Sequence, residues 1–146
     1  KGAELLENGS LDQLLQATLA DFDCQAGTIH VLRDGVLRLA AHIGIPPHIT
    51  QIVDTVPIGK GIAGLAAERR QPVTICNLQT DTSGQARPAA KTTGMEGSLA
   101  VPILASAGNE LRGVLGIAKA SAHDWTPEET ARLELIARAL ADRGLA

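Results

Sequence analysis

Two pairs of β-type runs, each joined by a short glycine turn, constrain the fold of this chain more than any other feature. The four runs lie at residues 28–33, 36–43, 98–105 and 110–119. Asp34-Gly35 joins the first pair and Ala107-Gly108-Asn109 joins the second, and such turns are typical of β-hairpins. Because hairpins connect antiparallel strands, these pairs and the short run 73–76 predict an antiparallel sheet rather than a doubly wound parallel one.

Helix start signals flank this sheet at both ends of the chain. Ser10 followed by Gln13 forms a capping box, and apolar residues at helical spacing extend from Leu11 to Phe22. Near the other end, Thr126-Pro127-Glu128-Glu129 combines an N-cap, a proline at the first helical position and a capping-box glutamate. Shorter helices are predicted between the two hairpins, at residues 48–53, 62–70 and 87–92.

Together these elements predict one α+β domain over residues 10–146, preceded by a linker or helix extension at residues 1–9. We expect a central antiparallel sheet of about six strands with the terminal helices on one face. Short helices and loops, including the polar segment 78–97, are expected to cover a ligand pocket on the other face, since a long insertion with little structure of its own usually carries function. Because the chain begins with Lys1 rather than Met, we expect it to be a piece of a longer protein.

The segment Gly59-Lys60-Gly61-Ile62-Ala63-Gly64 matches G-x-G-x-x-G, the fingerprint of dinucleotide-binding proteins. That site needs a buried parallel strand before the glycines and an acidic residue at the end of the next strand. Asp54 and Pro57 interrupt the run before the glycines, and the next strand ends at Asn77 without an acid. The context therefore disfavours dinucleotide binding, although the glycines still allow the backbone to approach a ligand closely.

Composition excludes several classes of function. The 146 residues carry a formal net charge of -3, and Phe22 and Trp125 are the only aromatic residues, so a basic nucleic-acid footprint and a platform for stacked bases are both missing. No apolar run approaches the roughly 18 residues of a membrane span and no signal peptide is evident, so we expect a cytoplasmic protein. Cys24 and Cys76 lack the spacing of metal ligands, and no metal is predicted.

Short motifs occur in a characteristic order along the chain. They are PIGKGIAG at 57–64, QPV at 71–73, GMEGSLAVPI at 94–103, LRGVLGI at 111–117 and DWTPEE at 124–129. In this order, from about Ser10 to Arg143, the sequence resembles the GAF domain family, the small-molecule sensor module of many signalling proteins. The resemblance implies a GAF/PAS-like fold, a ligand pocket and a regulatory role in signal transduction.

The specialised subtypes of this family differ at positions that the sequence shows directly. Bilin-binding members carry a cysteine, usually beside a histidine, near the middle helix, and the segment 81–97 has neither. Members that reduce free methionine sulfoxide use a cluster of cysteines in the pocket. Cys24 and Cys76 are too few for the three-cysteine pattern, whereas a two-cysteine variant stays open.

Cyclic-nucleotide-binding members carry an N-K…F-x-x-x-D-E signature. The matching positions here are Ala118-Lys119, Trp125 and Glu129-Thr130, so the asparagine and the last acid are missing. The resemblance therefore disfavours cyclic-nucleotide binding without excluding it. For Lys119 and Glu129 it implies a structural ion pair that ties the last strand to the final helix.

The start of the helix after the glycines is a candidate anion site. The amides of Gly61, Ile62 and Ala63 begin this helix, where unpaired N–H groups and the helix dipole favour a negative ligand. The alternative is that the glycines serve only a tight turn.

Side chains elsewhere in the sequence extend this candidate site. Arg87 and Lys91 lie four residues apart on either side of Pro88, which puts them on one face of an α-helix. If that face turns inward, the two side chains would clamp a carboxylate, phosphate or nitrate-like group. The alternative is that both are surface cations. His30 lies on the same face of the first strand as Thr28 and Leu32. Its imidazole either points into the ligand pocket or is a core side chain with its hydrogen bonds made within the protein. Ser98 is expected to add a hydroxyl at the rim.

The leading hypothesis is a non-catalytic sensor that binds a small anionic or polar metabolite, holds no covalently bound cofactor, and shifts its terminal helices. These helices are expected to form a homodimer and to act on a signalling output domain, fused or separate, with neither nucleic acid nor membrane as a partner. Two alternatives stay open. One is a redox enzyme of the free methionine sulfoxide reductase type that uses Cys24 or Cys76, and the other is a ligand-free dimerisation module.

Overall fold

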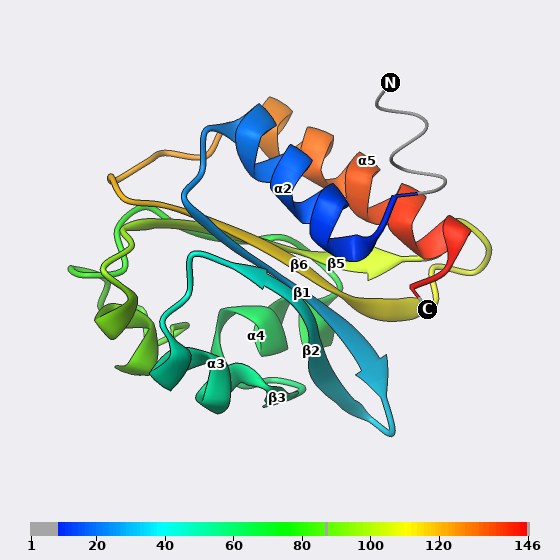
Figure 1. Ribbon diagram of the computed structural model, residues 1–146, viewed down its shortest axis with the longest axis horizontal. Coiled ribbons are helices and arrows are strands. Elements are labelled where there is room, and N and C mark those ends of the chain that lie inside the picture. The colour runs from blue at the N-terminus through cyan, green and yellow to red at the C-terminus, as the bar shows by residue number, and fades with distance from the viewer. Residues whose placement is uncertain (1–8, 87, 146) are drawn as a thin grey trace.

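The computed structural model describes residues 9–86 and 88–145 and contains one sheet with helices on both faces (Figure 1). The helices are α2 (Leu11–Phe22), α3 (Pro47–Val53), α4 (Gly61–Arg69) and α5 (Pro127–Arg143), with a 3-10 helix, η1 (Pro88–Thr93). The strands are β1 (Ala26–Arg33), β2 (Val36–Ile43), β3 (Thr55–Pro57), β4 (Val73–Ile75), β5 (Gly97–Leu104) and β6 (Leu111–Lys119). The predicted linker at residues 1–9 lies, except for Gly9, outside the described residues.

The sheet has the strand order β3-β2-β1-β6-β5-β4, and every neighbouring pair is antiparallel. Both predicted hairpins are present. Asp34 and Gly35 have φ angles of 53° and 79°, the left-handed values that a two-residue hairpin turn requires. The predicted α+β fold with its antiparallel sheet is therefore confirmed.

The short edge strand β3 was not among the individually predicted strands. Its three residues pair with the first three residues of β2, for example Val56 with Leu37. Pro57 cannot donate to a ladder, and an edge strand tolerates this because its outer side has no partner strand.

The two terminal helices pack on one face of the sheet, above it in Figure 1, as the sequence predicts. Both begin with complete capping boxes, at Ser10 with Gln13 and at Thr126 with Glu129. Between these helices and the sheet lies the main core, and its largest fully buried side chains include Leu15, Ile29, Leu99, Leu115, Leu133 and Leu140. Burial of each such side chain contributes about 1.5–3 kcal/mol, so this face carries much of the stability.

The other face of the sheet is covered by α3, α4 and η1 (Figure 1). A second, smaller core joins α4 to the sheet, with Ala66 and Ala67 against Val73, Ala100 and Val114. The predicted helix at 87–92 is instead the 3-10 helix η1, whose tighter winding changes which of its residues share a face. None of the described helices has the length and apolar character needed to cross a membrane.

Candidate functional site

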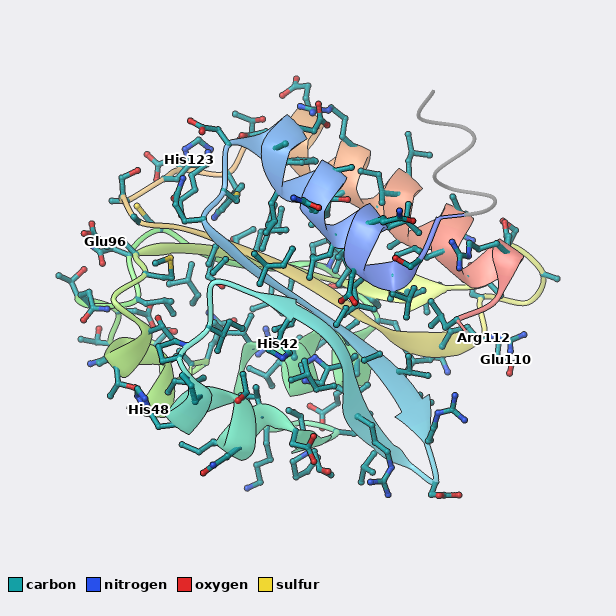
Figure 2. All side chains as sticks on the ribbon, in the orientation of Figure 1. His42, His48, Glu96, Glu110, Arg112 and His123 are labelled. Atoms are coloured by element: carbon teal, nitrogen blue, oxygen red, sulfur yellow. The ribbon has the colours of Figure 1, made fainter. Side chains whose placement is uncertain are left out.

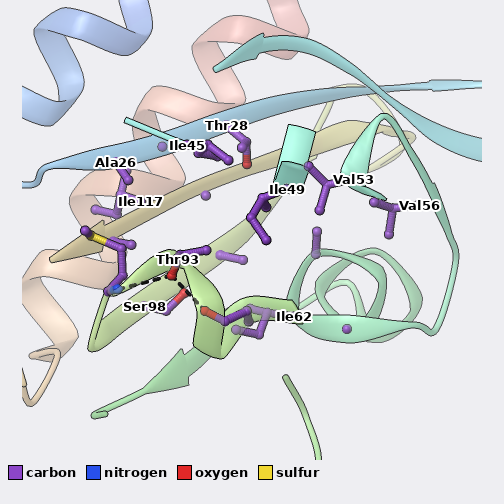
Figure 3. Close-up of a pocket in the computed structure, with 18 of the residues that line it drawn as sticks. Ala26, Thr28, Ile45, Ile49, Val53, Val56, Ile62, Thr93, Ser98 and Ile117 are labelled. Carbon is purple, nitrogen blue, oxygen red and sulfur yellow. Dashed lines mark hydrogen bonds between the residues drawn. The ribbon is translucent and has the colours of Figure 1, made fainter. Parts of the chain in front are cut away.

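A cavity of about 170 Å³ lies between the sheet and the helices α3, α4 and η1 (Figure 3). The sheet supplies its floor, α3 and the start of α4 supply its walls, and η1 with the loops beside it closes it. Its lining residues are Ala26, Gly27, Thr28, His30, Ile45, Ile49, Ile52, Val53, Val56, Lys60, Gly61, Ile62, Ala63, Leu78, Ala90, Thr93, Met95, Ser98, Ala100, Gly116, Ile117 and Ala118.

Small residues on three adjacent strands make room for this cavity. Ala26 of β1, Gly116 and Ala118 of β6 and Ala100 of β5 all lie on its floor. A Cβ atom at Gly116 would already lie 3.2 Å from Thr28 Oγ1, so even one added methyl group would crowd the floor. The cavity therefore exists because the floor lacks the large side chains that fill the opposite face.

The walls of the cavity are apolar. Ile49 of α3 is buried, and Figure 3 shows it with Ile62 of α4 on opposite sides of the space. Ile52 is 40% exposed and also lines the cavity, which puts it at the rim. These walls favour the uncharged, apolar part of a small molecule.

His30 is the most deeply buried polar side chain of the lining, with 2% of its surface exposed. Its Nε2 atom lies 2.8 Å from the carbonyl oxygen of Val53 in α3. Burial lowers the pKa of His30 below its ordinary value of 6.5, although the Val53 carbonyl and the nearby Asp54 carboxylate act in the opposite direction. The imidazole is therefore neutral at pH 7.

Hydroxyl groups add a few polar points to the cavity. The Thr93 hydroxyl donates to the Ala90 carbonyl at 2.7 Å and accepts from the Met95 amide at 3.1 Å, so it holds the cover in place (dashed lines in Figure 3). Thr28 and Ser98 also line the cavity, and their hydroxyls have no hydrogen-bond partner among the described residues. These two hydroxyls are free to rotate toward a bound molecule.

The first turn of α4 lines the cavity. Gly61, Ile62 and Ala63 line the cavity, and no side chain caps this end of the helix. Gly64 cannot carry a side chain here, because a Cβ atom would lie 2.5 Å from the carbonyl oxygen of Pro57. The last glycine of the motif thus serves close packing, while the amides of the three residues before it have no acceptor within the helix.

Lys60, the N-cap residue of α4, is the one cation in the lining among the described residues. The sequence did not indicate Lys60, because it occupies the variable position between the two glycines of the motif. Its position beside the helix start adds positive charge where the dipole already favours an anion.

The predicted cation clamp is not supported by the structure. Arg87 lies outside the described residues, as does the side chain of Pro88. Lys91 is exposed and does not line the cavity, and its carbonyl accepts a hydrogen bond from Gln79 Nε2 at 3.0 Å. The prediction assumed an α-helix around Lys91, whereas the structure has the 3-10 helix η1 there, with about three residues per turn.

The predicted ion pair between Lys119 and Glu129 is wrong. Lys119 Nζ instead donates to the carbonyl oxygens of Phe22 and Asp23, at 2.7 and 3.1 Å, where the end of α2 offers unpaired acceptors. The Glu129 carboxylate accepts from the Thr126 amide and from His123 Nε2, each at 2.9 Å. Figure 2 shows His123 in the connection that leads into α5.

The two thiols lie outside the cavity lining. Burial raises the pKa of Cys24 to about 11, since it disfavours the thiolate more than Lys119 favours it. Cys76 is exposed, and its hydrogen bond with Asp124 raises its pKa. Because the thiolate is the nucleophile, a raised pKa opposes thiol chemistry at each cysteine. The described residues also contain no group of three or more metal-ligating side chains.

The fold defines an α+β module whose sheet has a buried core on one face and a roofed cavity on the other. The chain belongs to the GAF domain family, whose model matches residues 8–142. Comparison with curated proteins yields no match.

Solved structures with this fold include both sensor-type domains and enzymes. The GAF domain from a phosphoenolpyruvate-protein phosphotransferase of Coxiella burnetii is 25% identical, with a TM-score of 0.71, over 90% of this chain and 77% of that chain. The GAF domain of the Acinetobacter phosphoenolpyruvate-protein phosphotransferase is 17% identical, with a TM-score of 0.75, over 94% and 81%. The free methionine-R-sulfoxide reductase from Neisseria meningitidis, solved with its substrate, is 16% identical, with a TM-score of 0.74, over 91% and 74%.

Proposed function

We propose that this GAF domain is a non-catalytic sensor whose ligand has a small apolar body and one polar or anionic end. The observation that carries this proposal is the apolar cavity of about 170 Å³ with uncapped helix amides at its edge. An engineered protein cavity of about 150 Å³ is known to bind benzene, so a single ring or a short branched chain sets the scale for this ligand.

The polar end of such a ligand would bind at the start of α4. The amides of Gly61, Ile62 and Ala63, together with Lys60, supply hydrogen-bond donors and positive charge at one side of the cavity. The apolar body would then lie against Ile49 and the small residues of the floor. This arrangement supports the small anionic or polar metabolite expected from the sequence.

The cysteines favour the sensor over a thiol reductase. A reductase of this fold would need an accessible, activated thiolate next to its substrate. Cys24 and Cys76 lie outside the cavity lining, and both have raised pKa values. The proposal therefore expects no turnover of free methionine sulfoxide by the wild-type protein in the presence of a thiol reductant, and such turnover would overturn it.

A direct test of the cavity uses benzoate as the probe. Benzoate combines a single ring with a carboxylate, and we expect it to raise the melting temperature of the wild-type protein. Ala118→Leu, which adds bulk to the floor, should abolish this shift while leaving the protein folded. Cys76→Ala, which changes an exposed residue outside the lining, is the matched control and should keep the shift.

We further propose that the sensor is a homodimer that passes its signal through α2 and α5. Both helices lie on the face opposite the cavity, and Leu135 of α5 is 69% exposed there. Such an exposed apolar side chain on α5 supports contact with a second copy of this chain. Sedimentation of the wild-type protein and of the Leu135→Glu variant tests it.

A further inference from the structure

The hydroxyl of Thr28 lies on the floor of the cavity, beside the middle one of its three strands. Thr28 of β1 pairs with Gly116 of β6, and Gly116 pairs with Ala100 of β5. The position that a Cβ atom would take at Gly116 lies 3.2 Å from Thr28 Oγ1, so this oxygen lies close to the cavity face of the neighbouring strand. Figure 3 shows the side chain of Thr28 with its oxygen directed toward the interior of the space.

This hydroxyl is unpaired and within reach of a bound molecule. Thr28 has no hydrogen-bond partner among the described residues. Its side chain is half-buried, and Oγ1 does not belong to the unpaired polar atoms that the described residues close off from solvent. A small molecule in the cavity can therefore contact this oxygen.

A wholly apolar molecule on this floor would cover the Thr28 hydroxyl without offering it a partner. Its neighbours on the same face of the sheet are Ala26, Gly116 and Ala118, which have no polar side-chain atoms. A polar group that loses water and gains no hydrogen bond disfavours binding. The floor thus favours a ligand that places a polar atom at this point.

We propose that the ligand carries a neutral polar group, a hydroxyl or a carbonyl, that forms a hydrogen bond with Thr28, in addition to its anionic end at α4. This inference rests on the proposed function, and it narrows the ligand class to small hydroxy or keto acids. Either group fits, because a threonine hydroxyl both donates and accepts. The group is neutral because Lys60, beside the start of α4, is the one charged side chain in the described lining, and a charge at the floor would lose its hydration unpaired.

The two polar groups of such a ligand lie at its opposite ends. Thr28 belongs to the floor and Ile62 to the first turn of α4, and Figure 3 shows them on opposite sides of the space. A ring with its two groups in para positions matches this arrangement, as in 4-hydroxybenzoate. The matched probe is 4-methylbenzoate, which has nearly the same size and carries a methyl group in place of the hydroxyl.

Isothermal titration of both probes measures the contribution of the hydroxyl. We expect the wild-type protein to bind 4-hydroxybenzoate about tenfold more tightly than 4-methylbenzoate. The methyl group is the more hydrophobic of the two, so apolar burial alone would give the opposite order. Thr28→Val keeps the shape of the side chain and the preference for a strand, removes the hydroxyl, and should lose the preference for 4-hydroxybenzoate. Thr28→Ser keeps a hydroxyl and should retain it.

Ser98→Ala is the control, because it removes a different hydroxyl from the same floor. Ser98 pairs with Ala118, and Ala118 pairs with Ala26. The strands of Ser98 and Thr28 are therefore two strand spacings apart, about 10 Å, and one ligand atom cannot contact both hydroxyls. Whatever its own effect on affinity, Ser98→Ala should keep the preference for 4-hydroxybenzoate.

The outcomes separate this inference from the function on which it rests. If benzoate raises the melting temperature but both para-substituted probes bind equally, or neither binds, the inference is overturned while the ligand site stands. A preference that survives in Thr28→Val, or that disappears in Ser98→Ala, overturns it as well. If benzoate and both para-substituted probes all fail to bind, the proposed function and this inference are both overturned.

Discussion

Replacement of Gly64 by alanine tests the role of the glycine motif. Gly64 has helical backbone angles inside α4, where alanine normally stabilises a helix by about 1 kcal/mol relative to glycine. The surroundings of Gly64 predict the opposite sign. A Cβ atom would lie 2.5 Å from Pro57 O and 3.1 Å from Gly59 N, whereas ordinary contacts begin at 3.4 Å.

The size of the effect follows from what must move. Pro57 O and Gly59 N are backbone atoms of a turn that is closed by the hydrogen bond from Gly59 N to Gly64 O, at 2.8 Å. Overpacking of this kind costs about 1–3 kcal/mol, and weakening the hydrogen bond adds to it. After the gain in helix propensity we expect a net loss of about 1–3 kcal/mol, or a melting temperature lower by roughly 3–10 °C.

Thermal and urea unfolding of Gly64→Ala and wild type measure this loss. Ala63→Gly is the comparison, because it changes the same helix by the same methyl group; it should cost about 1 kcal/mol through propensity, plus the packing of that methyl group against the smaller core. Since the turn also positions the amides at the edge of the cavity, Gly64→Ala should weaken benzoate binding too. A Gly64→Ala variant that is as stable as wild type, or more stable, would refute the close-packing argument.

Three further predictions follow from individual contacts. Because burial lowers the pKa of His30, its neutral form contributes stability that is complete above the unfolded pKa of 6.5 and is lost as pH falls toward the folded value. Urea unfolding should therefore show that the free energy of unfolding declines by up to about 1.4 kcal/mol per pH unit below 6.5, and the His30→Phe variant should lack this decline. Lys119→Met should lower the free energy of unfolding by about 1–2 kcal/mol, because the carbonyls at the end of α2 lose their donor, and a cost no greater than that of an exposed control, Lys91→Met, would contradict this. Leu135→Glu should shift the sedimentation of a dimer to that of a monomer without lowering the melting temperature, and an unchanged oligomeric state would exclude this surface of α5.

The parts of the fold that depend on local chemistry were predictable from the sequence. Asp34-Gly35 specifies a tight hairpin through its own backbone preferences, and the capping boxes at Ser10 and Thr126 fix where the terminal helices begin. The edge strand at 55–57 was missed because three residues are too few for an alternating pattern to be recognised, and the last of them is proline. Its pairing with β2 is decided by tertiary structure.

The sequence located those lining residues that a local pattern indicates, such as His30 and Ser98 on their strands and the start of α4. Gly61 and its neighbours were found because the helix start is visible in a single motif. The small floor residues, such as Ala100 and Gly116, were missed, since the cavity arises from what several strands lack together. Lys91 lies outside the lining, and the sequence does not reveal that this residue belongs to a 3-10 helix, while Arg87 lies outside the described residues.

The alternation of side chains along the central strands separates two tasks of the domain. On β5, Leu99 and Val101 enter the core beneath the terminal helices, while Ser98 and Ala100 face the cavity. Residues that hold the domain together and residues that shape its selectivity are therefore chain neighbours on opposite faces. Substitutions at the even-numbered positions can change the size and polarity of the cavity while leaving the main core unaltered. A family built on this sheet can diversify its ligands without rebuilding its scaffold.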